Sequence, residues 1–239
     1  MSSDRRGSLY LLPNTLGDVE PEAVIPAAVL DRTRSLDYIV AEDPKAARAF
    51  LKRIGATRPL QSIRVERLDH NTREGDVPAL LEPLLAGSDA GLLSEAGLPA
   101  VADPGASLVR LAHERDIRVV PLSGPSSIML ALAASGLDGQ RFVFHGYLPV
   151  AEAELVSTLK ECERQSRNLK QTQIFIETPY RNDRILATML RALAPATLVC
   201  VAADLSLESE AVKTRPVVAW REETPQLKGR PTVFLLLAE

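Results

Sequence analysis

The chain has few cysteines, histidines and aromatic residues, and each scarcity argues against a class of protein. Cys162 and Cys200 are its two cysteines, and because neither lies in a CxxC motif we expect no disulfide framework and a reducing, cytoplasmic location. The three histidines have neither HxxxH nor HExxH spacing, so we expect no metal site of the zinc-enzyme type. Aromatic residues make up 4% of the chain, which argues against a stacking platform for single-stranded nucleic acid.

Long hydrophobic runs, a strong charge of either sign and several common motifs are also missing. No apolar run reaches the ~18 residues of a membrane helix, and none of signal-peptide length follows residues 1–7, so we expect no membrane association. The 31 acidic and 28 basic residues leave a net charge of −3, so an RNA substrate would require a local basic patch. The absence of GxGxxG, Walker A and GxSxG motifs argues against a Rossmann dinucleotide site, an NTPase and a serine hydrolase.

The pattern that is present predicts an α/β fold. Short runs rich in β-branched residues alternate with longer segments of helical period. The uncharged run near the end predicts a buried strand that closes a sheet, and the charged segment 152–173 predicts a surface helix. A Ser-Gly-Pro-Ser turn after residue 122 predicts two domains, residues 1–122 and 123–239. The expected strands are residues 9–12, 38–41, 91–93, 118–122, 142–145, 174–177, 198–202, 217–220 and 232–238.

Four of these strands run into a capping residue followed by proline. The four junctions are Asp43-Pro44, Asp103-Pro104, Gly124-Pro125 and Thr178-Pro179. Asp, Thr and Gly suit the N-cap, and proline suits the first helical position, so each junction predicts a helix start. Ligands in open α/β sheets bind at the carboxyl ends of strands, so several junctions together also predict a binding crevice.

The loop after the third of the expected strands contains many turn formers. Residues 94–105 read Ser-Glu-Ala-Gly-Leu-Pro-Ala-Val-Ala-Asp-Pro-Gly, without a basic side chain. Gly97 and Gly105 permit a positive φ or a close approach of backbone to ligand, while Pro99 and Pro104 stiffen the loop. These properties predict a loop whose backbone amides hold a polar cofactor.

Taken together, the motifs resemble those of the S-adenosylmethionine-dependent tetrapyrrole methylase superfamily. Within it, the chain is most similar to the branch that methylates a ribose 2′-hydroxyl in small-subunit ribosomal RNA. The resemblance covers nearly the whole chain, and the loop 94–105 is its most specific part. The other motifs that carry it are Leu9-Tyr10, Ala41-Glu42-Asp43, Asp69-His70-Asn71, Gly124-Pro125-Ser126, Gly146-Tyr147-Leu148-Pro149, Glu177-Thr178-Pro179-Tyr180-Arg181 and Asp204-Leu205-Ser206.

The resemblance implies an enzyme of two α/β domains with mixed sheets, usually a homodimer, that holds S-adenosylmethionine in the cleft between the domains. The loop 14–18 would face the methyl acceptor. The chain departs from the ribose-methylating branch in this loop, at Pro44-Lys45 and at Leu207, and these changes fall where an acceptor should bind. Carried over by position, the cofactor-binding residues would be Ser94, Glu95, Ala96, Gly97, Ser126, Ser127, Glu177, Thr178 and Leu205.

Methyl transfer depends chiefly on positioning, although a hydroxyl acceptor benefits from a base that removes its proton. Glu95, His70 and Asp18 are the candidates, but each is also typical of a loop carboxylate or a surface imidazole. Glu42 and Asp43 fit helix capping better than catalysis.

Three functions remain open: an RNA methyltransferase, a methyltransferase for a tetrapyrrole or another small molecule, and a non-catalytic cofactor-binding homologue. If the substrate is ribosomal RNA or the small ribosomal subunit, basic side chains would bind its phosphates. The candidates are Arg32, Arg34, Arg64, Arg67, Arg73, Lys160, Arg164, Arg167 and Lys170.

Overall fold

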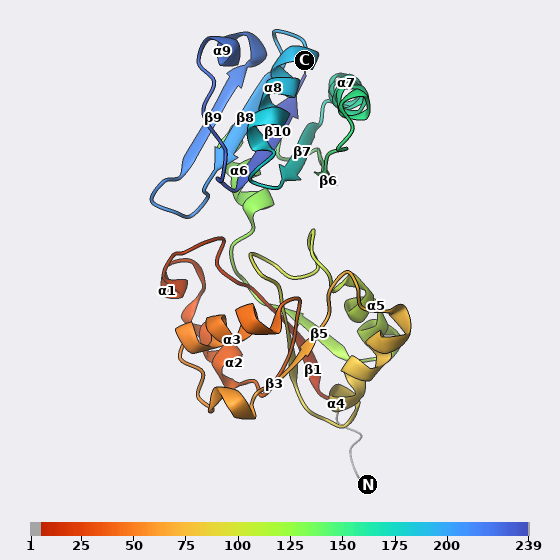
Figure 1. The fold of residues 1–239 in the computed structure, drawn as a ribbon. Coiled ribbons are helices and arrows are strands. Elements are labelled where there is room, and N and C mark those ends of the chain that lie inside the picture. The colour runs from red at the N-terminus through yellow and green to blue at the C-terminus, as the bar shows by residue number, and fades with distance from the viewer. Residues whose placement is uncertain (1–5, 239) are drawn as a thin grey trace. The chain divides into compact units, whose positions relative to one another are not determined.

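A computed structural model describes residues 6–238 of the chain. The chain divides into two compact units, Met1–Ser126 and Ser127–Glu239 (Figure 1). The boundary expected after residue 122 falls a few residues before this division. Each unit contains one sheet with helices packed on it, which confirms the predicted α/β class.

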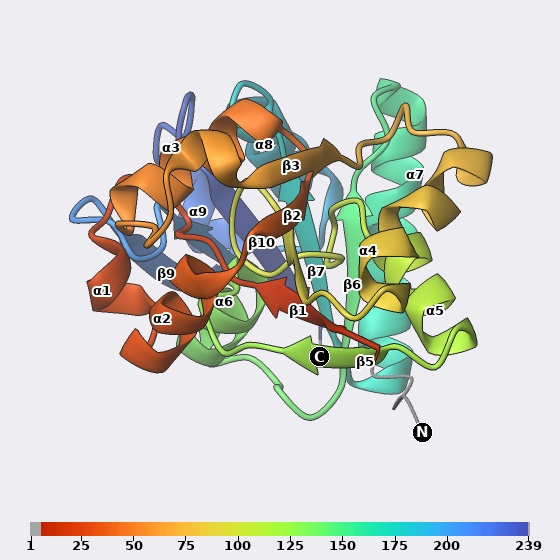
Figure 2. The ribbon, with the colours of Figure 1, turned by 90° about the horizontal axis from the view of Figure 1, so that it is seen from below.

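The first unit is built on a parallel sheet of five strands in the order β3-β2-β4-β1-β5. Strands β2 and β4 are buried throughout and β1 is buried or half-buried, as expected for a parallel sheet with helices on both faces (Figure 2). Helices α2 and α3 pack on one face and α4, α5 and η2 on the other. The elements are β1 (Ser8–Leu12), α1 (Pro21–Val24), α2 (Ala27–Ser35), β2 (Tyr38–Ala41), α3 (Pro44–Arg53), η1 (Leu60–Ser62), β3 (Arg64–Arg67), η2 (Glu74–Leu81), α4 (Glu82–Leu85), β4 (Ala90–Leu93), α5 (Ala106–Glu114) and β5 (Arg118–Pro121).

The second unit is built on a mixed sheet in the order β6-β7-β10-β8-β9. Strands β6 and β7 are parallel, and the other neighbours are antiparallel. Helices α7, α8 and α9 share a core with this sheet, in which Phe175 and Phe234 are fully buried. The elements are α6 (Ser127–Ser135), β6 (Phe142–Tyr147), α7 (Glu152–Leu169), β7 (Thr172–Glu177), α8 (Asn182–Ala192), β8 (Leu198–Ala203), β9 (Ala211–Pro216), α9 (Val217–Glu222) and β10 (Thr232–Leu237).

One expected strand is wrong and two strands were missed. Residues 217–220 begin helix α9, in which Val217 and Trp220 are buried three positions apart. Strands β3 and β9 carry too many charged residues to be read as strands, because both are edge strands with exposed side chains. The last strand, β10, lies between β7 and β8 and therefore forms the middle of its sheet rather than its edge.

Only one of the four strand-to-helix junctions has the predicted cap. Asp43 is the N-cap of α3, where its Oδ1 accepts a hydrogen bond from the Lys45 N–H at 2.8 Å. After the prolines at 104, 125 and 179 the helices begin only at residues 106, 127 and 182. Extra loop residues separate these strands from their helices. Gly105, with φ +132°, is one of them, and a turn in which the Arg181 N–H donates to the Thr178 carbonyl is another case.

Candidate functional site

The first group of candidate residues lies at one edge of the parallel sheet. Because all five strands run in the same direction, the loops that follow β1, β2, β4 and β5 leave the sheet at the same end. These loops carry Asn14, Glu42, residues 94–97 and residues 122–126. The sheet topology therefore brings together segments that are far apart in the sequence, at the end where such sheets bind ligands.

Asn14 holds the loop 94–97 in place. Its side-chain Nδ2 donates hydrogen bonds to the carbonyl oxygens of Ser94 at 3.1 Å and Glu95 at 2.9 Å. Its backbone exchanges two further hydrogen bonds with Gly97, of 2.8 and 3.2 Å. Asn14 and Ser94 are buried, so these bonds lie away from solvent. The loop is thus fixed to the end of β1 before any ligand binds.

Two glycines allow the neighbouring loops to approach closely. Gly97 has φ +67°, and a Cβ atom built there would lie 3.3 Å from Leu16 Cδ2 and 3.6 Å from the Pro125 carbonyl oxygen. A Cβ on Gly124 would lie only 2.1 Å from Pro13 Cβ. A side chain at Gly124 would therefore clash with Pro13, whereas at Gly97 the positive φ is what disfavours one. The loops that carry Ser94–Gly97 and Ser126 are therefore in contact within the first unit.

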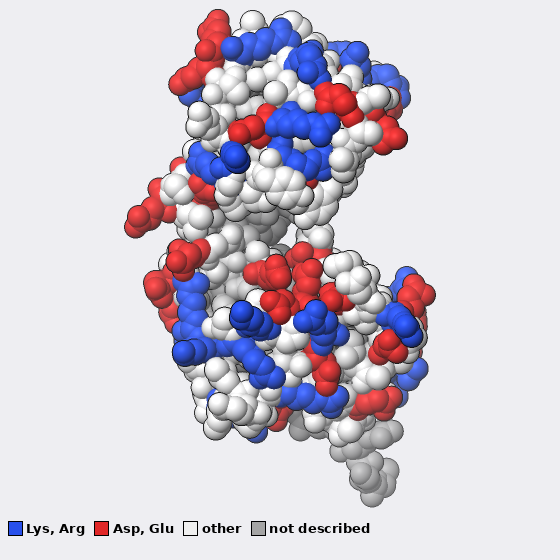
Figure 3. Space-filling model, in the orientation of Figure 1, with Lys and Arg blue, Asp and Glu red and all other residues white. Residues whose placement is uncertain are grey.

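A group of acidic side chains lies at the same end of the sheet. Burial, followed by the charges of Glu42 and Glu95, raises the pKa of Asp103 to about 6, even though a hydrogen bond with Ser94 acts to lower it. Burial and then Glu95 also raise the pKa of Glu42, whereas His70 lowers it. Acidic side chains gather at this end of the first unit in Figure 3. Crowded, partly buried carboxylates favour a positively charged ligand.

The structure brings two of the three candidate bases into this group. Glu95 is exposed on the loop after β4, and His70 is exposed after β3, each close enough to Glu42 to shift its pKa. Asp18 is fully exposed and forms an ion pair with Arg53 at 3.3 Å. Sequence reasoning missed Asp103 as a member of the group, because the Asp-Pro-Gly signal was interpreted as a helix cap.

The second group of candidate residues lies at one edge of the mixed sheet. Strands β7 and β8 both run antiparallel to β10, so both end beside its first residue. Thr232 pairs with Glu177 on one side and with Ala203 on the other. The predicted residues Glu177, Thr178 and Leu205 therefore come from neighbouring strand ends within the second unit.

Glu177 is held by its own turn. Its carboxylate is 1% exposed; Oε1 accepts hydrogen bonds from the Thr178 N–H at 2.8 Å and the Thr178 hydroxyl at 3.3 Å. Its Oε2 lies 2.8 Å from Arg181 Nη1, an ion pair without the angles of a hydrogen bond. The carboxylate therefore shapes the turn at the strand end, where the Thr178 N–H binds Glu177 and the Thr178 carbonyl accepts from the Arg181 N–H.

The sequence analysis named Asp204 only as part of the Asp204-Leu205-Ser206 motif, and its pairing with Arg230 was not predicted. Asp204 is buried with φ +54°, and its Oδ2 accepts hydrogen bonds from Arg230 Nε at 2.7 Å and Ser209 Oγ at 2.9 Å. Arg230 also donates to the Ser209 carbonyl at 2.8 Å. This network fixes the loop that carries Leu205. A pair 26 residues apart in sequence has no local signal, so only the fold reveals it.

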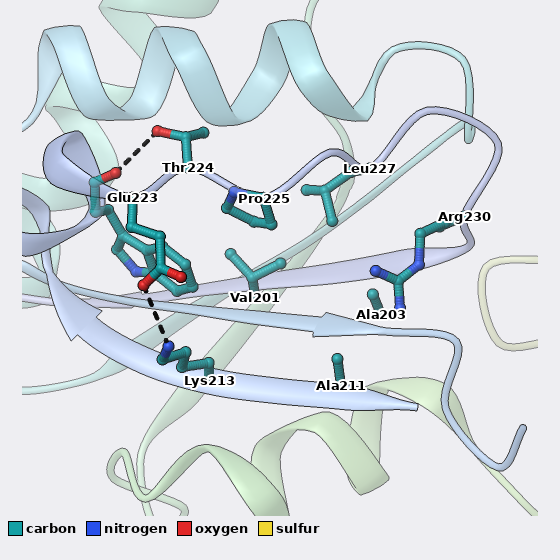
Figure 4. A pocket seen from close by; sticks show the side chains of 10 residues that line it. Val201, Ala203, Ala211, Lys213, Glu223, Thr224, Pro225, Leu227 and Arg230 are labelled. Carbon is teal, nitrogen blue, oxygen red and sulfur yellow. Dashed lines mark hydrogen bonds and ion pairs between the residues drawn. The ribbon is translucent and has the colours of Figure 1, made fainter. Parts of the chain in front are cut away.

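A cavity of about 190 Å³ lies beside this network, between β8, β9 and the segment that follows α9 (Figure 4). Val201, Trp220 and Leu227 give it an apolar lining, and Lys213 pairs with Glu223 across one side at 3.7 Å. The cofactor residues predicted from the sequence do not line this cavity.

Among residues 6–238, no helix combines the length and apolar character required to cross a bilayer. Nor does this described part of the chain contain three or more His, Cys, Asp or Glu side chains arranged to hold a metal ion.

Solved structures share this fold of two α/β units. The methyltransferase CobJ matches with a TM-score of 0.64 and 17% identity, over 97% of this chain and 94% of that one. Cobalt precorrin-4 methyltransferase CbiF matches with a TM-score of 0.59 and 17% identity, over 96% and 94%. At this identity the likeness establishes the fold.

The sequence comparisons establish the family. Residues 23–218 match the Tetrapyrrole (Corrin/Porphyrin) Methylases, and the chain belongs to this family. It is 32% identical over 238 residues to ribosomal RNA small subunit methyltransferase I of Escherichia coli O157:H7, covering 98% of this chain and 79% of that protein. The same enzyme of Streptococcus pyogenes serotype M1 is 32% identical over 225 residues, covering 93% and 74%. The predicted family and the prediction of an S-adenosylmethionine-dependent methyltransferase are confirmed.

Proposed function

We propose that the chain methylates a ribose 2′-hydroxyl in small-subunit ribosomal RNA. The observation that carries this proposal is the 32% identity to a ribosomal RNA methyltransferase, which extends over 98% of the chain. The solved methyltransferases CobJ and CbiF share the fold at only 17% identity. The motifs named above support the same branch of the family.

The first group of residues fits the methyl donor, which carries a positive sulfonium and a positive ammonium group. Partly buried Asp103 and Glu42 give this strand end negative charge, which suits such a ligand. We infer that Ser94, Glu95, Ala96, Gly97 and Ser126 hold the cofactor from this end of the first unit. When bound, S-adenosylmethionine supplies an electrophilic methyl group.

The predicted residues of the second unit complete the set that we assign to the cofactor. Ser127, Glu177, Thr178 and Leu205 are its members. The buried Glu177 keeps the Thr178 turn in one conformation, and the Asp204 network does the same for Leu205. Prearranged loops of this kind lose little conformational entropy when a ligand binds.

A base near the acceptor would remove the proton of the ribose hydroxyl as the new bond forms. Glu95 and His70 are the candidates that lie in the acidic group, and both are exposed enough to reach a substrate. Asp103 is a further candidate, because its raised pKa makes it a stronger base than an ordinary carboxylate. Asp18 remains a weaker candidate, since its carboxylate pairs with Arg53.

Basic side chains on the first unit support an RNA partner. Arg64 and Arg67 are exposed on the edge strand β3, where each pairs with a carboxylate of its own strand or the next loop. Such exposed pairs contribute little to stability, so phosphates can replace the carboxylates at small cost. Figure 3 shows Lys and Arg side chains next to the acidic end of this unit.

We also propose a homodimer and a cytoplasmic location. Helix α6 contains only apolar and small residues, and Met129 and Leu130 on it are 50% and 38% exposed. An apolar outer face of this kind favours burial against a second copy. A ribosomal RNA substrate places the enzyme where ribosomes are assembled.

Methyl transfer from labelled S-adenosylmethionine tests the proposed acceptor. Small ribosomal subunits from a strain that lacks the protein should accept label at a ribose, and uroporphyrinogen should not. Calorimetric titration with S-adenosylmethionine and S-adenosylhomocysteine should give saturable binding of both. Labelling of uroporphyrinogen but not of the subunits would refute the RNA substrate.

A further inference from the structure

Two exposed tyrosines lie on the second unit at the ends of neighbouring strands. Tyr147 is the last residue of β6 and is 59% exposed. Tyr180 follows β7 by three residues and is 74% exposed. Because β6 and β7 are parallel and Tyr147 pairs with Ile176, both tyrosines belong to the same end of the sheet.

Hydrogen bonds tie the two tyrosine-bearing loops to each other. Arg181, next to Tyr180, donates from Nη2 to the carbonyl oxygen of Pro149 at 2.9 Å. Arg184 donates from Nη2 to the carbonyl oxygen of Val150 at 3.0 Å. The loop that follows Tyr147 is therefore fastened to the segment that follows Tyr180.

The backbone beneath both rings is fixed. Leu148 is buried in the core of the second unit, and Arg181 is held by the ion pair with Glu177 at 2.8 Å. Rings on a fixed backbone lose little conformational entropy when they bind a partner. This property favours a role in recognition.

The exposure of these rings contrasts with the other tyrosines. Tyr38 is 3% exposed, and Tyr10 is partly buried. The chain has only one tryptophan, four tyrosines and five phenylalanines, so aromatic surface is scarce. Two large rings exposed at one end of one sheet mark a contact surface.

We propose that Tyr147 and Tyr180 form a surface on which an unpaired base of the RNA substrate stacks, an inference that rests on the proposed function. Sequence-specific RNA recognition targets unstacked bases, which stack on aromatic side chains. The low aromatic content argued against a long stacking platform, but a contact with one or two bases requires only these rings.

Nearby charge suits an RNA backbone. Arg184 and Arg191 both pair with the single carboxylate of Glu152, and all three side chains are exposed. The shared carboxylate leaves one positive charge in excess in this cluster, beside the loop that carries Val150. A phosphate adjoining a stacked base would find a cation there.

Binding measurements on full-length variants test the proposal. We would compare the parent with Tyr147→Ala, Tyr180→Ala and the double variant, using fluorescence anisotropy with deproteinised small-subunit ribosomal RNA and with a labelled oligouridine. Tyr147→Phe and Tyr180→Phe keep a stacking ring and serve as conservative variants. Phe142→Ala is the matched control, because Phe142 is 39% exposed at the opposite end of the same strand.

Each alanine variant should weaken RNA binding between about fivefold and about a hundredfold. The slope of log K against log salt should stay unchanged, because no phosphate contact is lost. The phenylalanine variants and Phe142→Ala should bind within about twofold of the parent, and S-adenosylmethionine should bind all variants equally.

Several outcomes would overturn the stacking surface while leaving the proposed function intact. These are unchanged RNA binding by the double variant, a changed salt slope, or a loss of self-association in sedimentation that accounts for the weaker binding. Weaker cofactor binding by the alanine variants would also overturn it, since the tyrosines would then be structural. A parent that neither binds nor methylates RNA would refute the proposed function itself, and the stacking surface with it.

Discussion

Replacing Asp103 with asparagine removes a carboxylate whose ionised form destabilises the folded protein. Burial and the charges of Glu42 and Glu95 raise the pKa of Asp103 from 3.8 to about 6. Below pH 3.8 the carboxyl is protonated in both states and has no effect. Between pH 3.8 and pH 6 the unfolded state releases the proton and the folded state keeps it, so the free energy of unfolding falls as the pH rises. Above pH 6 the carboxyl is ionised in both states, and the loss of stability is complete.

The size of this loss follows from the pKa shift. The rise to about 6 corresponds to about 3 kcal/mol, because one pKa unit equals about 1.4 kcal/mol. Asp103 is only partly buried, and solvent screening reduces the expected value to about 2 kcal/mol. Asp103→Asn should therefore raise the free energy of unfolding by about 2 kcal/mol at pH 7.5 and hardly change it at pH 4.

Urea unfolding followed by circular dichroism at both pH values measures this difference. Asp18→Asn is the control, because Asp18 is fully exposed and should give no pH-dependent gain of this size. An equal gain at pH 4 and pH 7.5 would show that the charge is not responsible. No gain at pH 7.5 would refute the buried-carboxylate argument altogether.

Three further predictions concern the cofactor and the second unit. The affinity for S-adenosylmethionine should rise with pH through about 6, because the ionised Asp103 attracts the sulfonium, while S-adenosylhomocysteine should respond less; flat calorimetric profiles for both would contradict this. Gly97→Ala should lower stability by about 1 kcal/mol and weaken cofactor binding, whereas Gly55→Ala, with φ +72° and open space around it, should affect stability alone. Glu163→Ala should lower the free energy of unfolding by about 2 kcal/mol, because the buried Glu163 carboxylate accepts hydrogen bonds from the Ala194 N–H and the Thr197 hydroxyl. Urea unfolding measures this loss, and a value below about 0.5 kcal/mol would contradict that reasoning.

The hydrophobic pattern of the sequence predicted the buried strands well, because most of their side chains are apolar and lie in the two cores. The pattern gave the wrong secondary structure where packing against the rest of the fold determines it. Residues 217–220 combine β-branched and aromatic side chains, yet Val217 and Trp220 are spaced for a helix that covers the sheet. Strands β3 and β9 are polar because each has only one neighbour.

For the candidate site too, the sequence indicated local features but not long-range contacts. Local motifs were enough to select the loop at Ser94 and the turn at Thr178, because each is a continuous segment. The long-range hydrogen bonds were not predicted: Asn14 holds the Ser94 loop from 80 residues away, and Arg230 holds Asp204, beside Leu205, from 26 residues away. Long-range partners have no signature in one sequence, and only the assembled strand ends bring them together.

The central place of β10 has a consequence for synthesis on the ribosome. Strands β7 and β8 are made first and can pair with β6 and β9, but the edge that each turns toward β10 stays open until residues 232–237 have left the exit tunnel. All strands of the first unit lie upstream, so that unit has everything it needs to fold earlier. A stop codon anywhere before residue 232 would leave two apolar strand edges open, and we expect such a product to aggregate or be degraded.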